Sequence, residues 1–188
     1  MITVTRPSTA TARQTTTGTN AGGRVLAVTR LVMGFVFLWA FLDKAFGLGY
    51  ATPGAGAWVD GGSPTRGFLS GLDHGPFAAT LRSWAGAPVA DWLFMLGLLG
   101  IAVALLLGVA LRPAAVSATL MLLLMWVAEW PLARHTDAGA LTRSTNPLVD
   151  YHVVYALVVV ALAVLAAGDP WGLGRRWTRL VGGRRWLR

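Results

Sequence analysis

Four long apolar segments dominate the pattern of hydrophobic and polar positions along the chain. They predict four helices at about residues 25–46, 91–111, 114–130 and 148–167. Each is close to the ~20 residues that a helix needs to cross the hydrocarbon core of a bilayer. The pattern therefore predicts an all-α protein with a bundle of four transmembrane helices. A helical bundle buried in water is the alternative interpretation.

Breaks in the pattern predict where these helices end. Arg112-Pro113 separates the second and third segments, and predicts a very tight turn with Pro113 at a helix start. Asn146-Pro147 precedes the fourth segment, and Gly168-Asp169-Pro170 ends it. In the first segment the uncharged run is short, from Leu31 to Leu42, so Arg30 is expected to reach the headgroups with its long side chain.

Three polar segments flank the predicted helices. Residues 1–23 contain eight threonines and no apolar run, which predicts a disordered tail. Residues 47–90 form a long loop whose apolar pieces favour short interfacial helices or a lid, a floppy connector being the alternative. Residues 171–188 alternate tryptophan and arginine, which is typical of an anchor on anionic headgroups; nucleic-acid binding is the alternative and is not expected.

The composition indicates that much of the protein surface contacts lipid. Apolar residues make up 55% of the chain and charged residues 13%, about half the usual share of a soluble domain. There is no cysteine, which excludes disulfides and thiolate chemistry within the chain.

The basic residues predict the orientation. In the four-helix plan, one side holds eleven of them: Arg6, Arg13, Arg24, Arg30, Arg112, Arg175, Arg176, Arg179, Arg184, Arg185 and Arg188. The other side holds five: Lys44, Arg66, Arg82, Arg134 and Arg143. The positive-inside rule then places both termini in the cytoplasm and residues 47–90 outside, in a multi-pass protein of the plasma membrane.

Ionisable residues near the helix ends mark a candidate site. Asp43 and Lys44 end the first predicted helix, Asp91 opens the second, and Glu129 and His152 lie in the third and fourth. Because successive helices alternate in direction, all five are expected in the outer half of the membrane. Charged groups at this depth are costly unless they are paired or line a cavity, so they are a default functional site. Solvation at helix ends, or hydrogen bonds between helices, is the structural alternative.

Aromatic residues at helical spacing extend this candidate site. Trp39 lies four residues before Asp43, Trp126 three before Glu129, and Tyr155 three after His152. A pocket lined by these rings would suit a quinone. His152, Lys44 or Tyr155 would donate to a quinone carbonyl oxygen, and Glu129 would relay protons. The histidines show no ligand spacing, so no metal is predicted. Four dispersed arginines outside the bundle, Arg66, Arg82, Arg134 and Arg143, are a weak candidate for gathering a small oxyanion.

Several of these segments resemble a known family. The stretch from Arg30 to Lys44 is similar to the first helix of DoxX-type membrane proteins, which commonly begins with arginine and ends with a polar residue. The segments 61–65, 125–131 and 146–152 resemble the DoxD-like branch. The resemblance covers roughly residues 24–175.

The resemblance implies a membrane subunit that passes electrons from thiosulfate, outside the cytoplasm, to quinone, with tetrathionate as product. It names no catalytic residues. Because the chain has no cysteine to hold sulfur, a second redox subunit or the quinone itself must accept the electrons. A non-catalytic scaffold for a redox partner is the main alternative, and a small-solute transporter ranks last. A second copy of the chain is a further partner left open.

Overall fold

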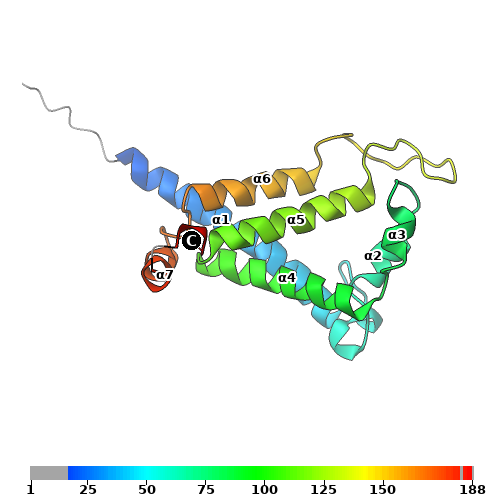
Figure 1. Cartoon of the computed structure of the whole chain (residues 1–188), viewed down its shortest axis with the longest axis horizontal. Helices are drawn as coiled ribbons and strands as arrows, with labels where there is room; N and C mark the ends of the chain where they lie inside the picture. The colour runs from blue at the N-terminus through cyan, green and yellow to red at the C-terminus, as the bar shows by residue number, and fades with distance from the viewer. Residues whose placement is uncertain (1–16, 183, 188) are drawn as a thin grey trace, which may run out of the picture.

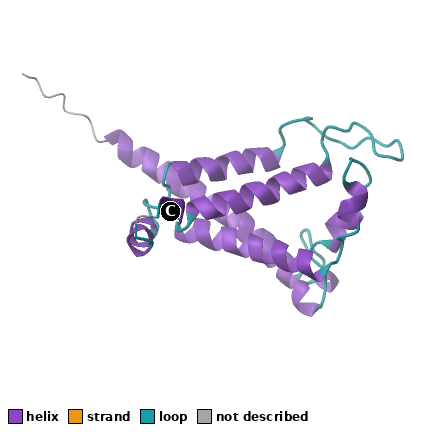
Figure 2. Ribbon diagram, in the orientation of Figure 1, coloured by secondary structure: helices purple, strands orange, loops and turns teal. Residues whose placement is uncertain are grey.

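The computed structural model describes residues 17–182 and 184–187, and every regular element in this part of the chain is helical (Figure 2). The α-helices are α1 (Thr17–Phe46), α2 (Arg66–Ser70), α3 (Ala78–Arg82), α4 (Pro88–Leu107), α5 (Leu111–Glu129), α6 (Tyr151–Val164) and α7 (Gly174–Leu180). Three short 3₁₀ helices are η1 (Gly54–Gly56), η2 (Trp58–Asp60) and η3 (Arg185–Leu187). The all-α prediction is confirmed for the described residues.

The four longest apolar helices form the body of the protein (Figure 1). α4, α5 and α6 run side by side, and α1 lies obliquely across them, packed mainly on α4. The larger buried side chains of their shared core are aliphatic apart from the Phe37 ring. They are Met33, Phe37, Met95, Leu98, Ile101, Leu105, Leu122, Val159 and Leu162. Much of the remaining helix surface is exposed and apolar, with Val32, Leu96, Val116 and Leu157 more than half exposed.

Three of these helices are long and apolar enough to cross a membrane. They are α1 over Ala21–Phe46, α4 with 20 residues and α5 with 19. α6 is equally apolar but has 14 residues, which corresponds to about 21 Å of helix. The prediction of 148–167 for this helix is therefore too long at both ends. The Asp150 side chain caps α6 by accepting hydrogen bonds from the backbone N–H groups of His152 and Val153, which fixes the start at Tyr151.

α1 is longer than predicted. It begins at Thr17, so residues 17–23, predicted to be disordered, are helical; residues 1–16 lie outside the described part. Once the apolar segment has formed a helix, each further residue adds one hydrogen bond without a new nucleation step, so the helix extends into the threonine-rich region.

The turn between α4 and α5 lies earlier than predicted. α4 spans 88–107 and α5 spans 111–129, in place of the predicted 91–111 and 114–130. Gly108 ends α4 in a left-handed conformation with φ 70°, and Ala110 before α5 also has positive φ. Pro113 is the third residue of α5 rather than part of the turn. Its missing N–H costs nothing there, because the first N–H groups of a helix have no intrahelical acceptor.

The placement of the Arg30 side chain differs most from the prediction. It is fully buried, and its guanidinium donates to backbone carbonyls at the ends of two helices instead of reaching headgroups. The acceptors are Leu105, Leu106 (2.8 Å), Ala167 (3.0 Å), Pro170 (3.5 Å) and Trp171 (3.1 Å). The Leu105 and Leu106 carbonyls lie at the negative end of the α4 dipole. The Ala167, Pro170 and Trp171 carbonyls lie in the turn after α6. Arg30 thus joins α1 to the ends of α4 and α6.

Close backbone contact surrounds this arginine. A Cβ at Gly108 would lie 2.9 Å from Gly168 Cα, and a Cβ at Gly168 would lie 2.2 Å from the Gly108 carbonyl oxygen. Gly174 begins α7, and its N–H donates to the Gly168 carbonyl. We call this the α7 end of the molecule.

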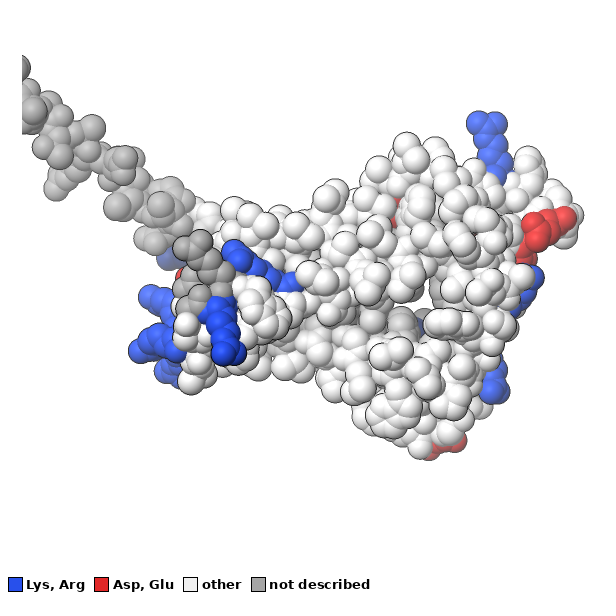
Figure 3. All heavy atoms as spheres, in the orientation of Figure 1, with Lys and Arg blue, Asp and Glu red and all other residues white. Residues whose placement is uncertain are grey.

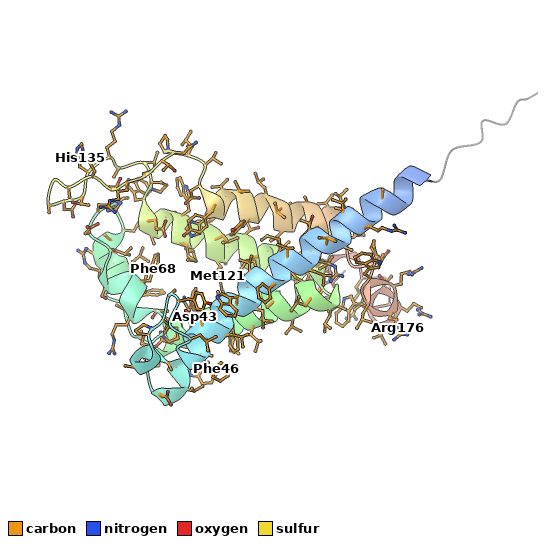
Figure 4. All side chains as sticks on the ribbon, turned by 180° about the vertical axis from the view of Figure 1, so that it is seen from behind. Asp43, Phe46, Phe68, Met121, His135 and Arg176 are labelled. Atoms are coloured by element: carbon orange, nitrogen blue, oxygen red, sulfur yellow. The ribbon has the colours of Figure 1, made fainter. Side chains whose placement is uncertain are left out.

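The α7 end carries the basic tail (Figure 3). α7 is seen end-on in Figures 1 and 4, so its axis runs across the bundle. Arg175, Arg176 and Arg179 are exposed on it, and the beginning of α1 lies at the same end. α2, α3 and the connection between α5 and α6 lie at the opposite end, which we call the loop end.

Candidate functional site

The candidate site lies at the loop end, where α5 finishes and α6 begins. Glu129 is the last residue of α5 and Tyr151 and His152 are the first two of α6. The Tyr151 hydroxyl donates to Glu129 Oε1 at 3.2 Å. The packing of α5 on α6 therefore brings together two of the five ionisable residues of the predicted site, Glu129 and His152.

His152 is the most buried member of the site. Its side chain has no exposed surface, and its Nδ1 lies 2.8 Å from Asp150 Oδ2. Since Asp150 is also the N-cap of α6, its carboxylate fixes the start of the helix and the orientation of the imidazole together. His152 Nε2 is buried and has no hydrogen-bond partner among the described residues. A buried polar atom without a partner is uncommon and calls for an explanation.

Two of the predicted aromatic residues are on the same pair of helices. Trp126 lies one turn before Glu129 on α5, and its Nε1 is also buried without a partner among the described residues. The Tyr155 ring, one turn further along α6, lies 6.0 Å from the Tyr151 ring. Tyr151 is not among the site residues predicted from the sequence, yet its hydroxyl donates directly to Glu129.

The other predicted site residues make their contacts elsewhere. Asp43 is buried, and its carboxylate accepts from the backbone N–H groups of Tyr50 (3.2 Å) and Ala51 (3.0 Å), which holds the turn after α1. The Trp39 ring packs against Tyr50, and the Lys44 ammonium lies 6.0 Å from the centre of the Phe94 ring. These contacts are with α1, α4 and the loop after α1; Figure 4 labels Asp43 there.

Asp91 also holds a loop. Its carboxylate is buried at the start of α4 and accepts from Ser63 Oγ (2.9 Å), Thr65 N (3.0 Å) and Thr65 Oγ1 (2.6 Å). These three hydrogen bonds hold the long loop on the start of α4, so the Asp91 carboxylate has a structural role.

A cavity of about 480 Å³ opens beside Glu129 at the loop end. Its polar lining includes Asp73, His74, Glu129, Arg143, Asp150 and Tyr151. His74 connects the loop after α2 to the end of α5: its Nε2 lies 2.8 Å from the Glu129 carbonyl oxygen, and its Nδ1 lies 2.7 Å from Oδ1 of the neighbouring Asp73. The sequence gives no signal for this role, since His74 is 55 residues away from Glu129 in an irregular segment.

The charge of this cavity disfavours a small oxyanion. Three carboxylates line it, from Asp73, Glu129 and Asp150, against a single arginine, Arg143. Arg82 is engaged with the Leu72 carbonyl instead. The arginines considered for an oxyanion therefore do not converge on the cavity.

Three of the residues around the site have side chains that commonly bind metal ions. One ligand atom from each of Glu129, Asp150 and His152 lies within 4.8 Å of the other two.

Comparisons with protein-family models, curated proteins and solved structures found no match to this chain. The resemblance to DoxX-type proteins thus stands on the sequence motifs alone.

Proposed function

We propose that this protein is a four-span membrane subunit of a quinone-linked oxidoreductase, with the quinone site formed by α5 and α6 near the loop end. In this arrangement both termini are cytoplasmic, and the cavity opens on the outer side of the plasma membrane. The three long apolar helices support the membrane assignment. α6 would be the fourth span, with the turn at 165–170 completing its path to the α7 end.

The distribution of arginines supports the orientation. Six arginines in or next to the elements that meet at the α7 end, namely the beginnings of α1 and α5 and the segment from α7 onward, are exposed: Arg24, Arg112, Arg175, Arg176, Arg179 and Arg184. Segments rich in arginine next to membrane spans tend to stay on the cytoplasmic side, so the α7 end would be cytoplasmic. α7 crosses the bundle axis and would lie along the headgroups, with exposed Trp171 and Trp186 in the interface.

The observation that carries the quinone assignment is the fully buried Nε2 of His152, for which the described part of the chain offers no hydrogen-bond partner. Asp150 holds the other ring nitrogen, so the imidazole is oriented before any ligand arrives. One oxygen of a quinone ring would complete the hydrogen bonding of Nε2. The indole N–H of Trp126, also without a partner among the described residues, is a second donor on the neighbouring helix.

The chemistry of the predicted donor sets a limit on what this chain does. Two thiosulfate ions lose two electrons and join through a new S–S bond as tetrathionate. A bound quinone supplies the acceptor for these two electrons and takes up two protons. The chain has no cysteine, and its cavity carries three carboxylates, so we propose that thiosulfate is oxidised on a partner subunit.

A non-catalytic scaffold is the second candidate, favoured by the loop end itself. Asp43 and Asp91 hold this loop in a defined shape, and it exposes large apolar side chains: Tyr50, Val59, Phe77 and Trp84. A surface of this kind would suit a soluble redox partner.

Turnover in proteoliposomes tests the proposal. Thiosulfate-dependent reduction of decylubiquinone is measured with the purified chain, alone and with the chains that co-purify with it. His152→Ala is expected to lower the rate about tenfold or more, the effect of losing one hydrogen bond of ~1.4 kcal/mol to a bound group. His135→Ala, at an exposed loop position, is the control and should keep the wild-type rate.

The outcomes separate the candidates. Unchanged rates in both His152→Ala and Glu129→Gln would remove these residues from the reaction. Absence of activity with every co-purifying chain would reject the enzyme assignment. A stable complex whose activity survives both substitutions would establish the scaffold.

A further inference from the structure

Glu129, Asp150 and His152 form a second kind of arrangement, which does not depend on quinone binding. They come from both sides of the long connection between α5 and α6. One ligand atom from each lies within 4.8 Å of the others, and the Asp150 Oδ2 to His152 Nδ1 separation is 2.8 Å. Two carboxylate oxygens and one imidazole nitrogen therefore meet at a single point of the fold.

These separations are close to those of a metal site. With metal–ligand bonds of roughly 2.1 Å, adjacent ligands are roughly 3 Å apart and opposite ligands roughly 4.2 Å apart. The Asp150 and His152 pair already lies at the spacing of adjacent ligands. Shifts of roughly half an ångström would bring all three atoms around one ion. Since Glu129 and Asp150 are only partly buried, their side chains can move by this amount.

The burial of His152 is a second observation at this cluster. Its side chain is fully buried, yet one of its two ring nitrogens has no partner among the described residues. The hydrogen bonds within the protein thus leave the imidazole half satisfied. An ion bound by Nδ1, the nitrogen that faces Asp150, would replace the hydrogen bond to this carboxylate and fix the proton on Nε2, so Nε2 would keep its role as the donor to a quinone.

Charge and access also favour a cation. The ion-pair partner of Asp150 is His152 rather than a lysine or arginine. The adjoining cavity presents Asp73, Glu129 and Asp150 against Arg143, so it attracts positive charge. Because Glu129 and Asp150 line this cavity, an ion can reach the site from the outer solution.

We infer that Glu129, Asp150 and His152 form a binding site for one divalent transition-metal ion that connects the end of α5 to the start of α6. A set of one imidazole and two carboxylates suits Zn²⁺, Mn²⁺ or Fe²⁺, whereas Ca²⁺ and Mg²⁺ prefer oxygen ligands alone. Water from the cavity would complete the coordination shell. The ion would join the two helices across the 20 residues, 130–149, that lie between Glu129 and Asp150.

Metal titration of the full-length chain tests this inference without any quinone or thiosulfate present. The chain is purified free of affinity tags in mild detergent, stripped with a chelator, and titrated with ZnCl₂ by calorimetry. Binding of Mn²⁺ is followed in parallel by loss of the free-ion EPR signal. We expect one ion per chain, together with a rise in melting temperature on adding Zn²⁺.

Three substitutions and one control make the result specific. Glu129→Gln, Asp150→Asn and His152→Gln should each weaken binding about 10- to 100-fold and abolish the rise in melting temperature. Asp150→Asn is the most informative, because asparagine is as good an N-cap as aspartate and preserves the start of α6. His135→Ala should bind Zn²⁺ like the wild type.

Binding that is absent, or that survives all three substitutions, would overturn the inference. Zinc binding without quinone-linked activity would retain the metal site and reject the proposed function. The reverse result would retain the quinone site and reject the metal.

Discussion

Replacement of Arg30 by methionine is expected to destabilise the protein strongly. Methionine keeps the length and apolar character of the stem but removes every donor to the α7 end. Four carbonyls at 3.1 Å or less then lose the arginine donor: those of Leu105, Leu106, Ala167 and Trp171. At about 1 kcal/mol for each bond, the gross loss is about 4 kcal/mol.

Part of this loss is offset, because the variant no longer buries a charged group. We expect a net decrease of about 3 kcal/mol in the free energy of unfolding. For a chain of this size, that corresponds to a fall of about 10 °C in melting temperature. Arg30→Lys should also be destabilised, since an ammonium has three donors and lacks the planar geometry of guanidinium.

Arg24→Met is the matched control, as this arginine lies on the same helix but is exposed. Melting of all three variants in one detergent, followed by circular dichroism, measures the effect. If Arg30→Met melts within 2 °C of Arg24→Met, the carbonyl contacts contribute no net stability and the argument for the α7 end is wrong.

Three further predictions concern the fold and its orientation. Gly168→Ala should lower the free energy of unfolding by about 2 kcal/mol, because its Cβ would lie 2.2 Å from the Gly108 carbonyl oxygen. Gly100→Ala, whose Cβ would meet no atom within 4 Å, is the control and should be neutral or stabilising in the same thermal melt. Asp91→Ala should lower the free energy of unfolding by about 2–3 kcal/mol and speed proteolysis of the loop at 61–87. Asp60→Ala removes an exposed carboxylate and should change neither quantity. Green fluorescent protein fused to the C-terminus should fluoresce, and alkaline phosphatase fused there should be inactive; the opposite pair would reject a cytoplasmic C-terminus.

Local sequence pattern was sufficient for the apolar helices and for part of the site. Glu129 and His152 stand out because ionisable groups are rare in such segments, and the alternating direction of helices predicts their common depth. Asp150 and Tyr151 belong to the same short segment as His152, so their proximity follows from the start of one helix. Their hydrogen bonds depend on the packing of α6 against α5.

What the sequence could not predict depends on distant backbone. The acceptors of Arg30 lie 75 to 141 residues away and are carbonyls, which every residue has, so no side-chain pattern identifies them. Gly108 was interpreted as part of a helix because a glycine in an apolar run looks the same whether it continues or ends the helix. His74 reaches Glu129 through an irregular loop, whose path has no periodicity to interpret.

The most direct test of the central claim is the quinone content of the purified protein. The chain and its His152→Ala and His135→Ala variants are extracted from quinone-containing membranes in mild detergent, and bound quinone is quantified after organic extraction. The account predicts about one quinone per chain in the wild type and in His135→Ala, and a loss of most of it in His152→Ala. No quinone in the wild type, or the same amount in all three proteins, would contradict it.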